Sequence, residues 1–266
     1  MTLGYTAQQI RDAEAPHLAA GEPLMQRAAH GLAVRILELL VERAGAAGPR
    51  ASVPSRVLVL VGSGDNGGDA LFAAAELAAS GVLVEAVGVG SRMHVGGREA
   101  AERSGAVVVV SPSEEWLAGL RARTARVDVV VDGILGTGTA PGAPALRGTA
   151  RRAVGEVLAA LEAESGESEP DLLPGRPAVV AVDVPSGIDP DTGATADDMV
   201  LPATVTVTFG GVKAGLLRGS GAGLAGRIEL VTIGIEDDLA RLEPEIDTDQ
   251  EHAETPHGSP ESADRG

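Results

Sequence analysis

The sequence of 266 residues predicts an α/β fold in which a mainly parallel β-sheet carries helices on both faces. Short apolar runs alternate with helical segments along most of the chain. The runs are continuously apolar, as in strands that are covered on both faces. Several of them end in glycine-rich turns that bear aspartate. Such turns are typical of the carboxyl edge of a parallel sheet, where open α/β proteins bind their ligands.

Local signals place each element along the chain. Leu24, Leu32 and Leu40 recur at helical spacing and predict one apolar face, and Thr6 and Ser113 precede helical segments as candidate N-caps. The predicted helices are Thr6–Ala20, Pro23–Ala44, Asp69–Ser80, Arg92–Ser104, Ser113–Arg123 and Arg147–Glu164. The predicted strands are Val57–Gly62, Val82–Val89, Ala106–Val110, Val127–Val131, Ala178–Val184, Val205–Phe209 and Arg227–Ile233. We expect residues 1–242 to form one domain and the acidic residues 243–266 to form a disordered tail.

Composition excludes several classes of function. The chain has no cysteine, which excludes disulfides, thiolate zinc sites and cysteine nucleophiles. A net charge of −17 and an aromatic content of 2% argue against nucleic acid as a partner. No apolar run is long enough to span a membrane, and the N-terminus lacks a signal-peptide pattern, so we expect a cytoplasmic location. About half of the net negative charge lies in Glu236–Gly266, away from the predicted strands.

The stretch Arg56–Leu71, RVLVLVGSGDNGGDAL, predicts a buried strand, a glycine turn and the start of a helix. Its glycines permit positive φ and a close approach of backbone to a ligand, and we place Asp69 as the helix N-cap. Asp65, Asn66 and Asp69 put oxygen atoms at the carboxyl end of the strand. The stretch therefore predicts a small-molecule or cation site, and a plain turn before a capped helix is the alternative.

Three more loops are expected at the same edge of the sheet. Asp132 ends one apolar strand, and Asp183 ends another with Ser186 close behind. Carboxylate, amide and hydroxyl oxygens suit alkali or alkaline-earth cations. No histidine lies in these loops, so an aspartate is the best candidate acid or base. Lys213, the single lysine, follows a fourth strand and is interpreted either as a phosphate contact or as a surface residue.

A dinucleotide-binding interpretation competes with this one. Residues 62–67 spell G-x-G-x-x-G after a strand, and Glu85 lies where an acid that binds ribose is found, which favours an NAD-dependent dehydrogenase. Asp65 and Asp69 weaken this interpretation, because they put negative charge where a pyrophosphate meets a helix N-terminus. Glu85 also lies within its predicted strand.

Taken together, the loops resemble the motifs of one family. GSGDNGGD at residues 62–69 resembles the G-x-G-N-N-G-G-D motif of the YjeF N-terminal domain family, the NAD(P)H-hydrate epimerases. VDGILGTG and VDVPSGIDPDTG are similar to the second and third motifs of that family, and TFGGVKAG is similar to its T-F-x-x-x-K-x-G motif. LMQRAAHGLA is similar to the N-terminal helix. The resemblance covers roughly residues 5–235.

The resemblance implies a Rossmann-like three-layer α/β/α sandwich, often a homodimer. The implied activity is that of an isomerase, which interconverts the R and S forms of hydrated NADH and NADPH in the repair of these cofactors. Carried over by motif, Asn66, Asp132 and Ser186 would bind a potassium ion. The implied substrate contacts are Asp65, Asn66, Gly67, Gly68, Asp69, Gly136, Thr137, Gly138, Thr139, Ala140, Pro141, Gly142 and Asp183.

The chemistry of the hydrate gives Asp183 its expected role. The hydroxyl group sits on a carbon bonded to the ring nitrogen, so its loss as water gives a planar iminium ion, and water that returns to the other face gives the epimer. A carboxyl group that exchanges protons with the leaving hydroxyl and the incoming water fits Asp183.

Two features depart from the family pattern. The family usually has asparagine where this chain has Asp65, which adds a negative charge beside the proposed cation and the substrate diphosphate. Many bacterial relatives continue into a dehydratase domain, whereas an acidic tail ends this sequence, so we expect a separate dehydratase as functional partner. A non-catalytic module that binds nucleotides or acts as a scaffold is the alternative function.

Overall fold

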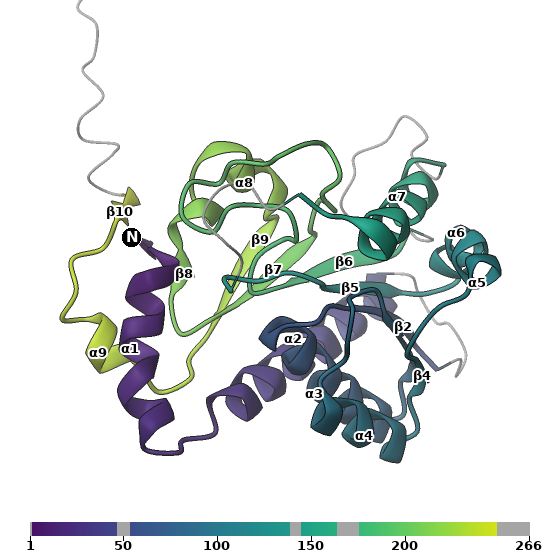
Figure 1. Ribbon diagram of the computed structural model, residues 1–266, viewed down its shortest axis with the longest axis horizontal. Helices are drawn as coiled ribbons and strands as arrows, with labels where there is room; N and C mark the ends of the chain where they lie inside the picture. Colours follow the sequence, from purple (N-terminus) through teal and green to yellow (C-terminus); the bar gives the residue numbers. More distant parts are fainter. Residues whose placement is uncertain (1, 47–53, 139–144, 164–175, 249–266) are drawn as a thin grey trace, which may run out of the picture.

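A seven-stranded parallel sheet forms the centre of the protein (Figure 1). The computed structural model describes residues 2–46, 54–138, 145–163 and 176–248. The strand order is β4-β3-β2-β5-β6-β7-β9, and every pairing is parallel. The strands are β2 (Arg56–Val61), β3 (Leu83–Gly88), β4 (Val107–Val109), β5 (Val129–Gly133), β6 (Ala178–Val182), β7 (Val205–Phe209) and β9 (Arg227–Val231). The predicted mainly parallel sheet is confirmed.

Helices cover both faces of this sheet, as Figure 1 shows below and above the strands. Val57, Val59 and Val61 of β2 pack in a core with α2, α3 and α4, while Leu58 and Leu60 pack with α5, α6 and α7. Each such buried side chain contributes about 1.5–3 kcal/mol. The first group is α2 (Leu24–Ala46), α3 (Asp65–Ala79) and α4 (Val95–Arg103), and the second is α5 (Glu114–Ala118), α6 (Leu120–Thr124) and α7 (Gly148–Ala163). The predicted three-layer sandwich is confirmed.

A second, three-stranded sheet joins distant parts of the chain. Strand β1 (Leu3–Tyr5) pairs in parallel with β8 (Val212–Lys213) and antiparallel with β10 (Ile246–Asp247). No pattern in the sequence predicts this sheet, because strands of two or three residues are too short to show a periodicity. Ile246 is buried, so the described fold continues past Leu242, where we expected the domain to end. The predicted disorder of residues 249–266 lies outside the described residues.

Helix α1 (Ala7–Ala19) lies beside α9 (Glu236–Leu239) at one side of the molecule (Figure 1). Thr6 is the predicted N-cap, and it forms a capping box with Gln9. At the far end of α1, the His17 imidazole lies 2.8 Å from both Glu22 Oε1 and Asp238 Oδ2. These contacts fix the orientation of α1.

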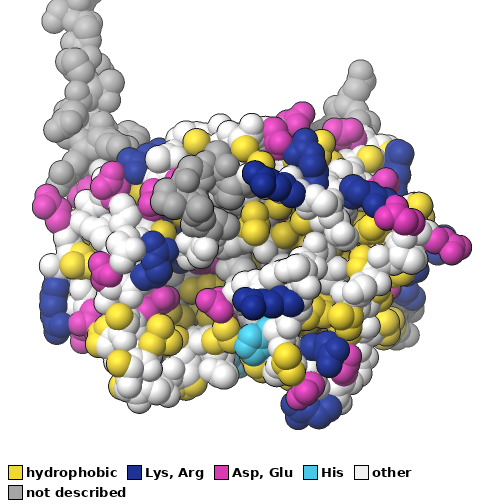
Figure 2. Space-filling model, viewed as in Figure 1, with side chains coloured by type: hydrophobic (Ala, Val, Ile, Leu, Met, Phe, Trp, Pro, Cys, Tyr) yellow, Lys and Arg dark blue, Asp and Glu magenta, His cyan; other side chains and the backbone are white. Residues whose placement is uncertain are grey.

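The remaining elements are short. A 3₁₀ helix, η1 (Ala214–Leu216), and α8 (Gly219–Leu224) lie between β8 and β9. The predicted helix Ser113–Arg123 is two helices, α5 and α6, which meet at Gly119. Among the described residues, no helix combines the length and apolar character that a membrane crossing needs. Over the described part of the face in Figure 2, basic and acidic side chains are interspersed, so neither sign of charge dominates that face.

Candidate active site

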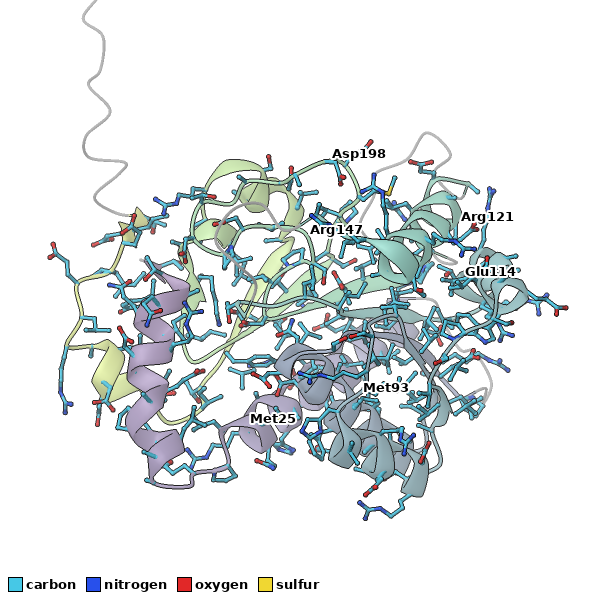
Figure 3. The ribbon with its side chains drawn as sticks, in the orientation of Figure 1. Met25, Met93, Glu114, Arg121, Arg147 and Asp198 are labelled. Atoms are coloured by element: carbon cyan, nitrogen blue, oxygen red, sulfur yellow. The ribbon has the colours of Figure 1, made fainter. Side chains whose placement is uncertain are left out.

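A cavity of 1220 Å³ lies at the carboxyl ends of β2, β5 and β6. Side chains of α1 cover it on one side, and the loops after β2 and β5 line it on another. Figure 3 labels two further lining residues on different sides of the view: Met25, from the start of α2, and Arg147, just before α7. The cavity therefore stands at the sheet edge where the sequence analysis expected a ligand.

Helix α3 starts earlier than predicted. Gly64 is its N-cap and Asp65 its first residue, so Asp69 is not the N-cap but lies inside the helix, and that prediction was wrong. None of the glycines of this loop adopts positive φ, and close packing explains Gly62 and Gly67. A Cβ atom at Gly62 would clash with the carbonyl of Ile134. The loop is thus pressed against the segment after β5, and this brings the two predicted loops together.

Asp69 points into the cavity from the second turn of α3. It is 7% exposed, and its Oδ1 atom has no hydrogen-bond partner. Burial, followed by the negative charges of Asp183, Asp65 and Glu14, raises the pKa of Asp69 well above its usual value. A buried carboxyl oxygen without a hydrogen-bond partner is costly to keep, so its presence in a cavity points to a functional role.

Asp183 lies directly after β6 and also lines the cavity. Among described residues other than glycine, only Asp183 has a left-handed φ, 68°, a conformation that costs about 1–3 kcal/mol and is often found at functional sites. Its Oδ1 accepts hydrogen bonds from Thr208 Oγ1 at 3.2 Å and from the Phe209 N–H at 3.3 Å. Lys213 forms a buried ion pair with the same oxygen.

Lys213 is not a surface residue, so that interpretation was wrong. Its side chain is 2% exposed, and besides Asp183 it contacts the carbonyl oxygen of Phe209 at 2.8 Å. The pairing of β8 with β1 positions this lysine, which is why sequence spacing alone did not locate it. Because Lys213 also lines the cavity, the phosphate contact stays a prediction.

The three candidate potassium ligands form one connected group, of which Asn66 lines the cavity. Ser186 donates from its hydroxyl to Asp132 Oδ1 at 2.6 Å and from its backbone to Oδ2 at 2.8 Å. The Leu135 N–H donates to the Ser186 hydroxyl at 2.8 Å. Asn66 donates from Nδ2 to the carbonyl oxygens of Leu135 at 2.9 Å and Val182 at 2.6 Å. The structure therefore brings together residues that lie 120 positions apart in the sequence.

The chemistry of this group fits an alkali cation. Asp132 is 0% exposed, and no ion pair of Asp132 occurs among the described residues. Burial raises its pKa, and hydrogen bonds from Ser186 partly offset that rise. With both Asn66 amide hydrogens engaged by carbonyls, its Oδ1 is left as an acceptor. One carboxylate with neutral oxygens is a hard donor set of low charge.

The other predicted contacts divide into two groups. Asp65, Gly136, Thr137 and Gly138 line the cavity, whereas residues 67 and 68 are buried in the first turns of α3 and are not among its lining residues. Thr139, Ala140, Pro141 and Gly142 lie outside the described residues. Arg11 of α1 donates to the carbonyl oxygen of Thr137 at 3.0 Å, so α1 reaches across to the glycine loop.

Several lining residues were missed by the sequence analysis. Arg11 and Glu14 reach the cavity from α1, and Arg92 and Arg147 reach it from the segments before α4 and α7. Burial raises the pKa of Glu14. The pairing of β1 and the docking of α1 bring Arg11 and Glu14 to the sheet edge. No local pattern in the sequence signals this placement.

The family model described as the YjeF-related protein N-terminus matches residues 21–215. The chain belongs to this family. It is 47% identical over 243 residues to the NAD(P)H-hydrate epimerase of Microbacterium testaceum, which covers 91% of this chain and 82% of that one. It is 48% identical over 234 residues to the enzyme of the same name from Clavibacter michiganensis, which covers 88% and 91%.

Some relatives in the YjeF-related family are longer proteins with a different name. The chain is 39% identical over 236 residues to the bifunctional NAD(P)H-hydrate repair enzyme Nnr of Mycobacterium tuberculosis, and the match spans 87% of this chain but 41% of that protein. The crystal structure of the yeast protein ynu0 has a TM-score of 0.59 at 18% identity, with 80% of this chain and 82% of that one covered. This likeness supports the fold.

Proposed function

We propose that this protein is an isomerase that interconverts the R and S forms of hydrated NADH and NADPH. The names of its close relatives in the YjeF-related family support this activity. The observation that carries it is the Asp183–Lys213 ion pair, held by a strained backbone in a cavity lined by glycine loops. The cavity exceeds the range of about 300–1,000 Å³ that is usual for small-ligand sites, in keeping with a dinucleotide ligand.

The reaction breaks and re-forms one carbon–oxygen bond. The ring nitrogen donates its lone pair, the hydroxyl leaves as water after it gains a proton, and a planar iminium ion forms. Water then adds to the opposite face and loses a proton. Asp183 lies in the cavity as the group that takes protons from water, and its negative charge stabilises the cationic ring.

The substrate diphosphate needs positive charge elsewhere in the cavity. Arg11, Arg92 and Arg147 line it, and no ion pair of these three occurs among the described residues. Guanidinium groups bind phosphate through paired hydrogen bonds. We assign the diphosphate to these arginines. Asp65, at the start of α3, also lines the cavity, but in this assignment it does not contact the diphosphate.

We propose potassium as the cofactor, held by Asn66, Asp132 and Ser186. The ion would fix the loops after β2, β5 and β6 and offset the charge of the buried Asp132 carboxylate. All protons in the reaction are moved by side chains of this chain and by water. The homodimer, the cytoplasmic location and a separate dehydratase as partner remain predictions.

Two other functions are weaker. In a dehydrogenase, Glu85 would bind the ribose, but it lies within β3 and pairs with Arg123 at 3.1 Å. A binding or scaffolding module would need no strained backbone at Asp183 and no buried, unpartnered carboxyl oxygen at Asp69. Both features cost stability, and such costs are typical of catalytic sites.

The test follows one epimer of hydrated NADH over time. A single pure epimer is incubated with the protein, and the two forms are separated by chromatography. We expect interconversion far above the spontaneous rate, with further acceleration in potassium buffer relative to sodium buffer. Folded protein that gives no acceleration in either buffer would overturn the enzymatic function and favour the binding module.

A further inference from the structure

Asp69 and Asp183 share one cavity but have different partners. Asp183 is bonded to Lys213, Thr208 and Phe209 and faces the cavity as one half of an ion pair. The Oδ1 atom of Asp69 is buried and has no partner. A site in which Asp183 acts alone lacks a proton for the first step, because the leaving hydroxyl must be protonated while Asp183 is charged.

The surroundings of Asp69 favour its neutral form. The charged groups that face it are Asp65 on its own helix, Glu14 on α1, Asp183 after β6 and Lys213 on β8. Three of these four are acidic, and the lysine is engaged by Asp183 and a carbonyl. Burial adds to the effect and is the largest cause of the raised pKa of Asp69.

We infer that Asp69 is the proton donor of this site and Asp183 its base, so that epimerisation uses one protonated and one charged carboxyl group. The inference rests on the proposed function, since it names a second catalytic residue for the same reaction. Glu14 is a weaker candidate because it is only half-buried and remains in contact with water.

The proton balance closes over one turnover. Asp69 gives its proton to the ring hydroxyl, the carbon–oxygen bond breaks, and water leaves while the nitrogen lone pair forms the iminium bond. A water molecule adds to the opposite face and gives a proton to Asp183. That proton returns to Asp69 through the released water. In the reverse direction the same steps run backward, and no electron is gained or lost.

The first test replaces Asp69 with asparagine, which keeps the size of the side chain and its ability to donate a hydrogen bond but cannot transfer a proton. We expect Asp69→Asn to lower kcat by about 10²–10⁴-fold while substrate binding changes little. Asp69→Glu should recover part of the loss. Asp128→Asn, at the opposite end of β5, is the matched control and should retain the wild-type rate.

The second test follows the rate against pH. If Asp69 must be protonated, the kcat/KM of the wild type falls as the pH rises through the pKa of Asp69, which gives the pH profile an alkaline limb. The residual activity of Asp69→Asn should lack this alkaline limb. Asp65→Asn removes one of the charges that raise the pKa of Asp69, so it should shift the limb to lower pH. An Asp69→Asn variant that keeps the wild-type rate and the alkaline limb overturns the inference.

A third measurement does not depend on activity. In protein with carboxyl-labelled aspartate, the carbon-13 resonance that disappears in Asp69→Asn should titrate well above the usual aspartate range. Titration in the ordinary range would overturn the inference even if the protein is an epimerase. If the wild type shows no epimerase activity, the proposed function fails, and the resonance still decides whether Asp69 is held protonated.

Discussion

Asp183 has an ion-pair partner and two further hydrogen bonds, whereas Asp69 has an oxygen with none. Two carboxyl groups in different environments within one cavity are a recurrent way to obtain an acid and a base from the same residue type. The difference arises from tertiary structure: Lys213 reaches Asp183 through the pairing of β8 with β1, and α3 buries Asp69.

Replacing the base tests the first half of this arrangement. We expect Asp183→Asn to lower kcat by about 10²–10⁴-fold, because asparagine cannot take a proton from water, and to leave substrate binding largely intact. The variant leaves Lys213 buried without its carboxylate, which is destabilising. The double variant Asp183→Asn/Lys213→Met removes both charges and serves as control. Equal loss of binding and turnover in both would assign Asp183 to binding alone.

The burial of Asp69 should also lower the stability of the folded protein. Because its folded pKa lies above the unfolded value, the folded protein holds a proton that the unfolded chain has lost, and stability falls as pH rises from about 4 to the folded pKa. We expect Asp69→Asn to raise the free energy of unfolding at neutral pH by about 1–3 kcal/mol. Denaturant unfolding at several pH values measures this. A gain that is equal at all pH values would contradict the assignment.

At the scale of elements, the site depends on loops that follow adjacent parallel strands. Strand β5 carries Asp132 into the Asn66–Ser186 group at its carboxyl end, while Asp128, before its other end, accepts a hydrogen bond from the Arg56 N–H. Two aspartates near opposite ends of one strand thus have different expected roles.

This pair gives a matched test of the potassium proposal. Asp132→Asn removes the single negative charge of the proposed ligand group, so the potassium concentration for half-maximal activity should rise about 10-fold or more. Asp128→Asn should leave it unchanged. The measurement is activity against potassium at constant ionic strength, and equal curves for Asp132→Asn and the wild type would remove Asp132 from the ligand set.

Helix α1 is held at its end by a charged cluster. His17 contacts Glu22 and Asp238, and these carboxylates raise the pKa of His17 above its usual value, with the hydrogen bond to Asp238 as the largest cause. Because the folded pKa is the higher one, this contribution to stability is complete below about 6.5 and is lost as pH rises through the folded pKa.

Replacing His17 should therefore change the pH dependence of stability. We expect His17→Gln to abolish the loss of stability above pH 6.5 and to weaken the docking of α1, which carries Arg11 and Glu14. His30→Gln on the exposed surface of α2 is the control. Urea unfolding across this pH range measures the slope. A wild-type slope in His17→Gln would show that the cluster does not contribute.

At the scale of the whole molecule, sequence pattern predicts the large sheet but not what closes the site. Continuous apolar runs identify the central strands β2, β5 and β6, because a strand that is buried on both faces has to be apolar throughout. The edge strand β9 is partly exposed and carries Arg227 and Glu229. Asp132, Asp183 and Ser186 follow from that topology. The small sheet does not, because its strands pair over long sequence separations and are too short for a pattern.

The same limit applies to the site. The glycine motifs indicate where a ligand binds, and the family resemblance indicates which residues to examine. Neither shows that Lys213 is buried against Asp183, that α3 begins at Asp65, or that Asp69 lacks a partner. These features depend on how α1, α3 and β8 pack, so they become visible only in three dimensions.

The most direct measurement of the central claim uses one pure epimer of hydrated NADH in water enriched in oxygen-18. The reaction proposed here exchanges the ring hydroxyl whenever the carbon inverts. We therefore predict that the inverted product formed by the wild type carries oxygen-18, and that Asp183→Asn forms inverted, labelled product about 10²–10⁴-fold more slowly. An inverted product that retains its original oxygen would contradict the loss and return of water, and no inversion at all would contradict the epimerase.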